Sequence, residues 1–168
     1  TFKSNPQGLT SLINRLLTPL TNVIMSRNGT IDKYMGDCIM AFWNAPIEVT
    51  GHAREACHAA LAMLKALAAL NRELSAESET ADILRIGIGI NTGRLILGTV
   101  GESNRMEGSV ISDAVNVAAR LEGLTKVYRT PLLIGEGTKS MLDPNQLLIR
   151  SIDQVAVKDK SEAIMIYE

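Results

Sequence analysis

Hydrophobic residues recur at helical spacing in three stretches of the chain. In residues 9–25 the apolar side chains are three or four positions apart, which predicts a helix with one buried face and a kink or new turn at Pro19. Residues 52–77 are rich in alanine and leucine and contain neither glycine nor proline, so a long helix is predicted there. A third helix is predicted from Asp113 to about Lys126.

Runs of β-prone residues lie between these helices. Residues 30–35 and 38–43 flank the pair Gly36–Asp37, which predicts a β-hairpin with Asp37 exposed at its tip. A short helix is predicted for residues 137–142. Further strands are predicted for residues 84–90, 94–100, 131–134, 146–151, 154–157 and 163–167. Because helices and strands mix without a repeating β-α-β period, an α+β fold with a largely antiparallel sheet is favoured.

Length and charge narrow the class of protein. The 168 residues fit a single domain, 1–168, and 46% hydrophobic residues are enough to fill a core. Lys and Arg number 17 against 18 Asp and Glu, and this balance argues against a dedicated nucleic-acid-binding protein. Two cysteines are too few for a disulfide framework and indicate a reducing compartment. No apolar stretch is long enough to predict a membrane span.

Two sequence patterns resemble ligand sites, but a structural role is favoured for both. Gly87, Gly89 and Gly93 depart from the dinucleotide-binding fingerprint, because the third glycine comes one residue late and a strand is predicted to follow. We expect strand glycines at which another backbone or a ligand comes close. His52 lies five and six residues from Cys57 and His58, spacings that do not share a helix face, so a helix surface and core are favoured over a metal site. Cys38 is predicted to be a half-buried strand residue.

Two further sets of residues keep both a functional and a structural interpretation. Asp37 at a hairpin tip is placed to bind a hard cation, although an aspartate in a turn is usually only a turn residue. Asn116 and Arg120 are spaced i, i+4 on a predicted helix, where an amide and a guanidinium can hydrogen-bond a sugar oxygen and a phosphate. The alternative is an exposed helix face paired with Glu122 or Asp113.

Several long motifs resemble class III nucleotidyl cyclases. Residues 29–43 (GTIDKYMGDCIMAFW) resemble the metal-binding hairpin of that family. Residues 86–93 (IGIGINTG) also resemble the family. Residues 113–122 (DAVNVAARLE) resemble its catalytic helix, and residues 157–160 (VKDK) its terminal lysine motif. The matches follow family order from about residue 8 to residue 167. The chain is most similar to bacterial adenylate/guanylate cyclases whose catalytic domain follows a membrane-anchored sensor.

This resemblance implies a ferredoxin-like α+β core that forms a head-to-tail homodimer with active sites at the interface. It implies conversion of ATP to cyclic AMP and pyrophosphate, assisted by two divalent cations (Mg²⁺ or Mn²⁺). It further implies a cytoplasmic domain whose parent protein is anchored in the inner membrane through an upstream sensor.

The resemblance also implies roles for the residues that match the motifs of the family. Asp37 matches the second of the two metal-binding aspartates. Asn116 would orient the ribose and Arg120 would stabilise charge on the α-phosphate, while Lys158 would bind the terminal phosphates. Lys33 falls at the purine-selecting position, where lysine accompanies adenine, and Ser109 stands at the position of its partner.

The chain also departs from the family pattern. The first metal-binding aspartate of the family lies on an N-terminal strand, and this sequence begins after that point, so we expect the first cation ligand to be absent from residues 1–168. Ser109 replaces the usual Asp or Thr and is a weaker selector. Glu107–Gly108 and Ser112 replace the more usual Asp-Tyr and Gly before the catalytic helix. A catalytically incompetent cyclase-like domain, which binds nucleotide or serves as a regulatory dimerisation partner, is therefore the alternative.

Overall fold

A computed structural model describes residues 6–78, 82–102, 105–156 and 163–168, and for residue 6 and residues 99–102 and 105–111 it describes the backbone alone. The chain divides into two compact units, the first ending at Arg85 and the second beginning at Ile86. The assignment of residues 1–168 to one cyclase domain stays a prediction.

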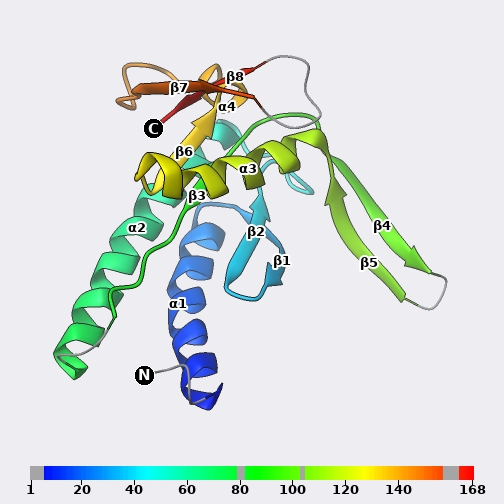
Figure 1. Ribbon diagram of the computed structural model, residues 1–168. Coiled ribbons are helices and arrows are strands. Elements are labelled where there is room, and N and C mark those ends of the chain that lie inside the picture. The colour runs from blue at the N-terminus through cyan, green and yellow to red at the C-terminus, as the bar shows by residue number, and fades with distance from the viewer. Residues whose placement is uncertain (1–5, 79–81, 103–104, 157–162) are drawn as a thin grey trace. The chain divides into compact units, whose positions relative to one another are not determined.

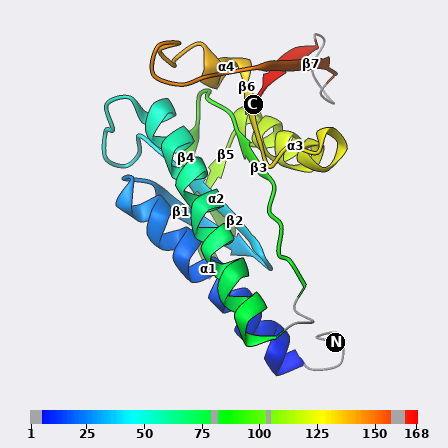
Figure 2. The same cartoon turned by 90° about the vertical axis from the view of Figure 1, so that its left-hand side faces the viewer.

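Two helices and a hairpin build the first unit. Helix α1 (Pro6–Ser26) and helix α2 (His52–Glu77) lie side by side (Figure 2). They run antiparallel, because Arg15 in the middle of α1 contacts Glu77 at the end of α2 at 2.7 Å, while Arg27, just after α1, contacts Glu55 near the start of α2 at 3.4 Å. The prediction of α2 is confirmed at both ends. Helix α1 continues through Pro19 to Ser26, so the predicted helix is confirmed and the kink at Pro19 stays a prediction. The buried apolar residues that these helices supply are Leu20, Ile24, Ala53, Ala56, Cys57, Ala59, Ala60, Leu67, Leu70 and Leu74.

The predicted hairpin is confirmed. Strand β1 (Thr30–Met35) pairs antiparallel with β2 (Cys38–Phe42), and the register closes with Met35 opposite Cys38. Its second strand ends one residue earlier than predicted. Between Ile31 and Lys33 the register shifts, so that Asp32 has no partner residue on β2.

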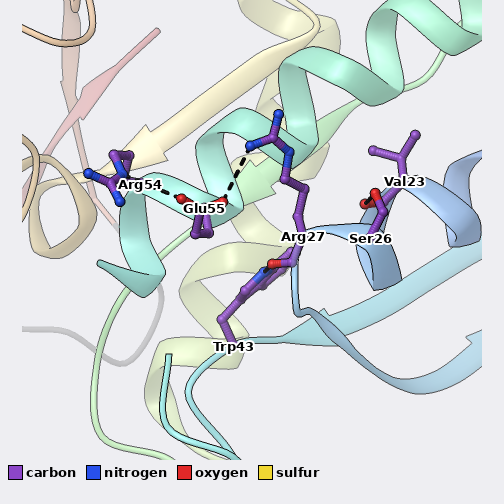
Figure 3. A network of polar contacts seen from close by, with 6 residues as sticks. All are labelled: Val23, Ser26, Arg27, Trp43, Arg54 and Glu55. Carbon is purple, nitrogen blue, oxygen red and sulfur yellow. Dashed lines mark hydrogen bonds and ion pairs between the residues drawn. The ribbon is translucent and has the colours of Figure 1, made fainter. Parts of the chain in front are cut away.

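Polar contacts anchor the base of the hairpin to both helices (Figure 3). The indole nitrogen of Trp43, just after β2, donates a hydrogen bond to the carbonyl oxygen of Arg27, just after α1, at 2.9 Å. The guanidinium of Arg27 in turn contacts Glu55 on α2 at 3.4 Å. Gly29 leaves room for the Trp43 ring, because a β-carbon at this position would come within 2.8 Å of it. The base of the hairpin is therefore fixed.

The second unit contains a four-stranded sheet in the order β3-β6-β8-β7 (Figure 1). Its strands are β3 (Ile88–Ile90), β6 (Leu132–Gly135), β7 (Ser151–Val155) and β8 (Ile164–Tyr167). The pair β3–β6 is parallel, while β6–β8 and β7–β8 are antiparallel. Helix α3 (Asp113–Tyr128) packs on β3 and β6, and the short helix α4 (Glu136–Lys139) contacts β6 and β8. The core of this unit is formed by Val117, Leu121, Leu133 and Ile166.

A separate hairpin completes the second unit. Strand β4 (Ile96–Glu102) pairs antiparallel with β5 (Arg105–Ile111) along its full length (Figure 1). Strand β5 was not predicted. The strand predicted for residues 84–90 is reduced to β3, which pairs with β6 and not with β4. Residues 146–150 are not a strand. Helices combined with mostly antiparallel pairs still agree with the predicted α+β class.

Close packing of α3 on β3 explains why glycine occupies positions 87 and 89. A β-carbon on Gly89 would lie 2.2 Å from the carbonyl oxygen of Ala118, and one on Gly87 would lie 2.2 Å from the hydroxyl of Thr125. Glycine therefore lets the helix approach the strand. From the sequence we expected that either another backbone or a ligand would come close to these glycines, and the structure shows another backbone, that of α3.

Candidate active site

Asp37 occupies the two-residue turn that joins β1 to β2. Gly36 precedes it with a φ of 63°, a left-handed conformation that glycine adopts without strain. The Asp37 side chain is exposed, and the described part of the chain offers it no hydrogen-bonding or charged partner. A carboxylate held on a tight turn whose base is anchored is accessible to a cation or to a second molecule.

Lys33 lies on β1, four residues before Asp37, opposite Met40. Its side chain is 39% exposed, and its ammonium nitrogen lies 3.6 Å from a carboxylate oxygen of Asp32. Asp32 was missed by sequence reasoning. Its position beside Lys33 was visible in the sequence, but the bulge that brings the two side chains together was not.

Helix α3 carries Asn116 and Arg120 on its exposed face. The helix begins at a well-formed cap, where the Ser112 hydroxyl accepts a hydrogen bond from the Ala114 N–H at 2.9 Å. The opposite face is buried through Ala114, Val117, Leu121 and Thr125. With one face fixed to the sheet, the exposed amide and guanidinium one turn apart are available to a ligand.

The structural alternative for this pair is met in its exposed helix face but not in its ion pairs. In the parts of the chain that the structure describes, Arg120 forms no ion pair with Glu122 or Asp113. The Asn116 backbone N–H contacts the Ser112 carbonyl oxygen at 3.5 Å, as expected in the first turn of the helix.

The two remaining predicted site residues are described less fully. Ser109 lies on β5 opposite Gly98 in the register, but its side chain lies outside the described residues. Lys158 lies outside them altogether. The predicted site is thus represented by Lys33 and Asp37 in the first unit and by Asn116 and Arg120 in the second.

The two cysteines lie in different environments. Cys57 is buried in α2, and burial raises the pKa of its thiol to about 11. Among the described residues, no group of three or more His, Cys, Asp or Glu side chains is arranged to hold a metal ion. Cys38 is exposed at the start of β2, so its prediction as a half-buried residue is wrong. The first position of this strand lies beside the turn, where little packs over the thiol.

None of the helices in the described parts of the chain combines the length and hydrophobicity needed to cross a membrane.

Comparison with known proteins assigns the family. The sequence profile of the adenylate and guanylate cyclase catalytic domain matches residues 1–167. An adenylate cyclase of Anabaena cylindrica is 41% identical over 167 residues, which is 97% of this chain but only 32% of that protein.

Solved structures agree with this assignment. The adenylyl cyclase CyaB from P. aeruginosa superposes with a TM-score of 0.86 and 31% identity, over 97% of this chain and 82% of that one. The guanylyl cyclase Cya2 superposes with a TM-score of 0.80 and 26% identity, over 97% of this chain and 80% of that one. The α+β cyclase fold expected from the motifs is confirmed. The chain belongs to the adenylate and guanylate cyclase catalytic domain family.

Proposed function

We propose that this chain is the catalytic domain of an adenylate cyclase, which converts ATP to cyclic AMP and pyrophosphate. The observation that carries the proposal is the family match over residues 1–167. The 41% identity to an adenylate cyclase supports ATP as the substrate. Because ATP is a cytoplasmic nucleotide, we place the domain in the cytoplasm.

The reaction is an intramolecular displacement at phosphorus. The ribose 3′-oxygen attacks the α-phosphorus, the new 3′-oxygen–phosphorus bond forms, and the bond to the leaving pyrophosphate breaks. The hydroxyl proton passes to solvent or to a phosphate oxygen. Negative charge grows on the α-phosphate and on the leaving group, so catalysis depends on orienting the ribose and stabilising that charge.

The exposed face of α3 carries groups suited to both tasks. In this proposal Asn116 hydrogen-bonds the ribose and holds its 3′-oxygen toward the α-phosphate. Arg120, one turn further along, donates to the α-phosphate oxygens, for which a planar guanidinium is well matched. Lys158 would bind the terminal phosphates.

Divalent cations, Mg²⁺ or Mn²⁺, fit Asp37, the one of the two expected metal-binding aspartates that residues 1–168 contain. Such ions are often bound by one or two carboxylates together with the phosphates of the substrate, and Asp37 offers an exposed carboxylate on an anchored turn. Asp37 would hold one side of a two-cation site. When bound, the cations would neutralise phosphate charge and lower the pKa of the attacking hydroxyl.

Nucleobase selection is assigned to Lys33 on β1, with Ser109 on β5 as its partner. An ammonium group donates to a ring nitrogen that accepts in adenine but carries a hydrogen in guanine. Both adenylyl and guanylyl cyclases superpose on this chain. Our assignment of ATP as the substrate therefore rests on Lys33 and on sequence similarity to adenylate cyclases.

The experiment that tests the proposal measures cyclic AMP and cyclic GMP formed by the full protein as its gene encodes it, with Mn²⁺ or Mg²⁺. We expect cyclic AMP from ATP, and a loss of about 100-fold or more in kcat for Arg120→Ala, the usual effect of removing one charge-stabilising donor.

Lys126→Ala provides the matched control, because Lys126 is an exposed cation at the end of the same helix. Equal activity of Arg120→Ala and the control would contradict the role of Arg120. Binding of ATP without product would instead support the alternative, a cyclase-like domain that acts as a nucleotide-binding or dimerisation partner.

A further inference from the structure

A buried carboxylate lies directly beside the lysine that we assign to the nucleobase. The Asp32 side chain is only 5% exposed, and its Oδ2 atom has no hydrogen-bond partner in the described structure. A buried carboxylate without hydrogen bonds is costly unless an opposite charge compensates it. The Lys33 ammonium, 3.6 Å from this oxygen, supplies that charge.

The contact depends on an irregularity in the hairpin. In a regular strand, consecutive side chains point to opposite faces, so neighbours such as Asp32 and Lys33 would be kept apart. Here Ile31 pairs with Ala41 and Lys33 pairs with Met40, which leaves Asp32 as an extra residue on β1. Such a bulge re-aims the side chains next to it. The bulge accounts for the approach of the two charged groups.

Restraint of Lys33 has a functional consequence. A lysine side chain has four rotatable bonds, and ordering it on ligand binding costs conformational entropy. A fixed negative charge next to the ammonium reduces the number of positions that it samples before the ligand arrives. At the same time the Lys33 side chain remains 39% exposed, so a ligand can reach it.

We propose that Asp32 is a positioning residue for Lys33, and that the bulge at Asp32 holds the lysine ammonium in place to distinguish adenine from guanine nucleotides. This inference rests on the proposed role of Lys33 in nucleobase selection. Ser109, the other expected partner of Lys33, carries no charge, so Asp32 supplies the anionic partner from the same strand.

Four proteins test the inference: the wild type, Asp32→Asn, Lys33→Met and the double variant. Asp32→Asn keeps the size of the side chain but removes its charge. Binding of 3′-deoxy-ATP and 3′-deoxy-GTP, which lack the attacking oxygen, is measured by calorimetry with the full protein. The ratio of kcat/KM for ATP and GTP is measured in parallel.

We expect Lys33→Met to lower the preference for the adenine nucleotide about tenfold or more, and Asp32→Asn to lower it about fivefold, within the range of coupling between charged neighbours. In the Lys33→Met background, Asp32→Asn should change the preference no further. Glu48→Gln, which removes an exposed carboxylate from the same unit, serves as the control and should leave the ratio unchanged.

Each contrary result has a definite meaning. If Lys33→Met lowers the preference but Asp32→Asn does not, the positioning role is overturned and the role of Lys33 stands. If Asp32→Asn acts equally with and without Lys33, Asp32 is a structural residue and the inference is likewise overturned. If Lys33→Met leaves the preference intact, both roles fail. Should Asp32→Asn not fold, Asp32→Ser is substituted, and urea unfolding of every variant separates loss of stability from loss of selectivity.

Discussion

At the scale of single residues, Asp37 is the position at which chemistry and folding can be separated most cleanly. We expect Asp37→Ala to lower cyclic AMP formation by about 100-fold or more, because it removes a proposed cation ligand. The free energy of unfolding should fall by less than about 1 kcal/mol, since the side chain is exposed and packs against little. Both are measured on the full protein, by product assay and urea unfolding.

Asp37→Asn distinguishes the two roles further, because an amide can still occupy the turn but binds divalent cations poorly. An active, stable Asp37→Asn protein would contradict the cation role. Unfolding of Asp37→Ala would show that the aspartate is needed for the turn itself.

The two cysteines differ in environment, and the exposed Cys38 should react faster with alkylating reagents than the buried Cys57. Burial raises the pKa of the Cys57 thiol to about 11, so at pH 8 almost none of it is thiolate, the reactive form. Cys38 is exposed at the start of β2. We expect iodoacetamide at pH 8 to label Cys38 in the native protein and both residues after unfolding, as measured by mass spectrometry of peptides. Rapid native labelling of Cys57 would contradict its burial.

Single residues also show where sequence reasoning reached its limit. The exposure of Asp37, Asn116 and Arg120 was predictable, because a turn signal and a helical period depend on local sequence. The burial of Asp32 was not predictable, since it depends on a bulge between β1 and β2 that shifts the register by one residue. Nothing in the local sequence of β1 specifies such a shift.

At the scale of secondary-structure elements, the close packing of α3 on β3 governs the position of Asn116 and Arg120. We expect Gly89→Ala to lower the free energy of unfolding by about 1–3 kcal/mol, because the new β-carbon would meet backbone atoms of Ala118 and Glu122 at 2.2 and 2.4 Å. Urea unfolding measures the loss.

Gly123→Ala is the matched control on the same helix. No atom lies within 4 Å of the β-carbon that it would add, and the position is exposed. Alanine should therefore stabilise the helix by about 0.5–1 kcal/mol. A Gly89→Ala protein as stable as this control would show that the helix does not approach the strand so closely.

The elements that were mispredicted share a physical cause, namely dependence on partners outside their own residues. The strand predicted to start at residue 84 is short because the Leu84 N–H and carbonyl bond the Asn71 side-chain amide of α2, each at 2.9 Å, in place of a neighbouring strand. Its partner β6 is short as well, since Pro131 precedes it and α4 follows. Strand β5 has a glycine and several polar residues, and its seven-residue pairing with β4 decides its structure. The helices α1 and α3 and the first hairpin were predictable because their patterns are local.

At the scale of the whole molecule, the proposed site residues belong to two different units. Lys33 and Asp37 lie on the hairpin of the first unit, and Asn116 and Arg120 lie on α3 of the second. In the head-to-tail homodimer that the family resemblance implies, each active site would take Asp37 from one chain and helix α3 from the partner. Activity should therefore depend on assembly, and the specific activity of the wild type should fall on dilution below the dissociation constant of the dimer.

A shared site makes a sharper prediction for mixtures of two inactive variants. An Asp37→Ala chain keeps its helix α3, and an Asn116→Ala chain keeps its hairpin, so a heterodimer of the two contains one site with every proposed residue in place. We expect each variant alone to be nearly inactive. An equal mixture should recover up to about a quarter of the wild-type activity, since half of randomly paired dimers are mixed and each carries one intact site of two. A mixture of Asn116→Ala with Arg120→Ala is the control, because both changes fall on helix α3 and no arrangement restores an intact site. Product formation is measured after native mass spectrometry has established the fraction of heterodimer. Heterodimers without recovered activity would contradict a site shared between chains, because complementary defects on opposite halves of such a site must compensate.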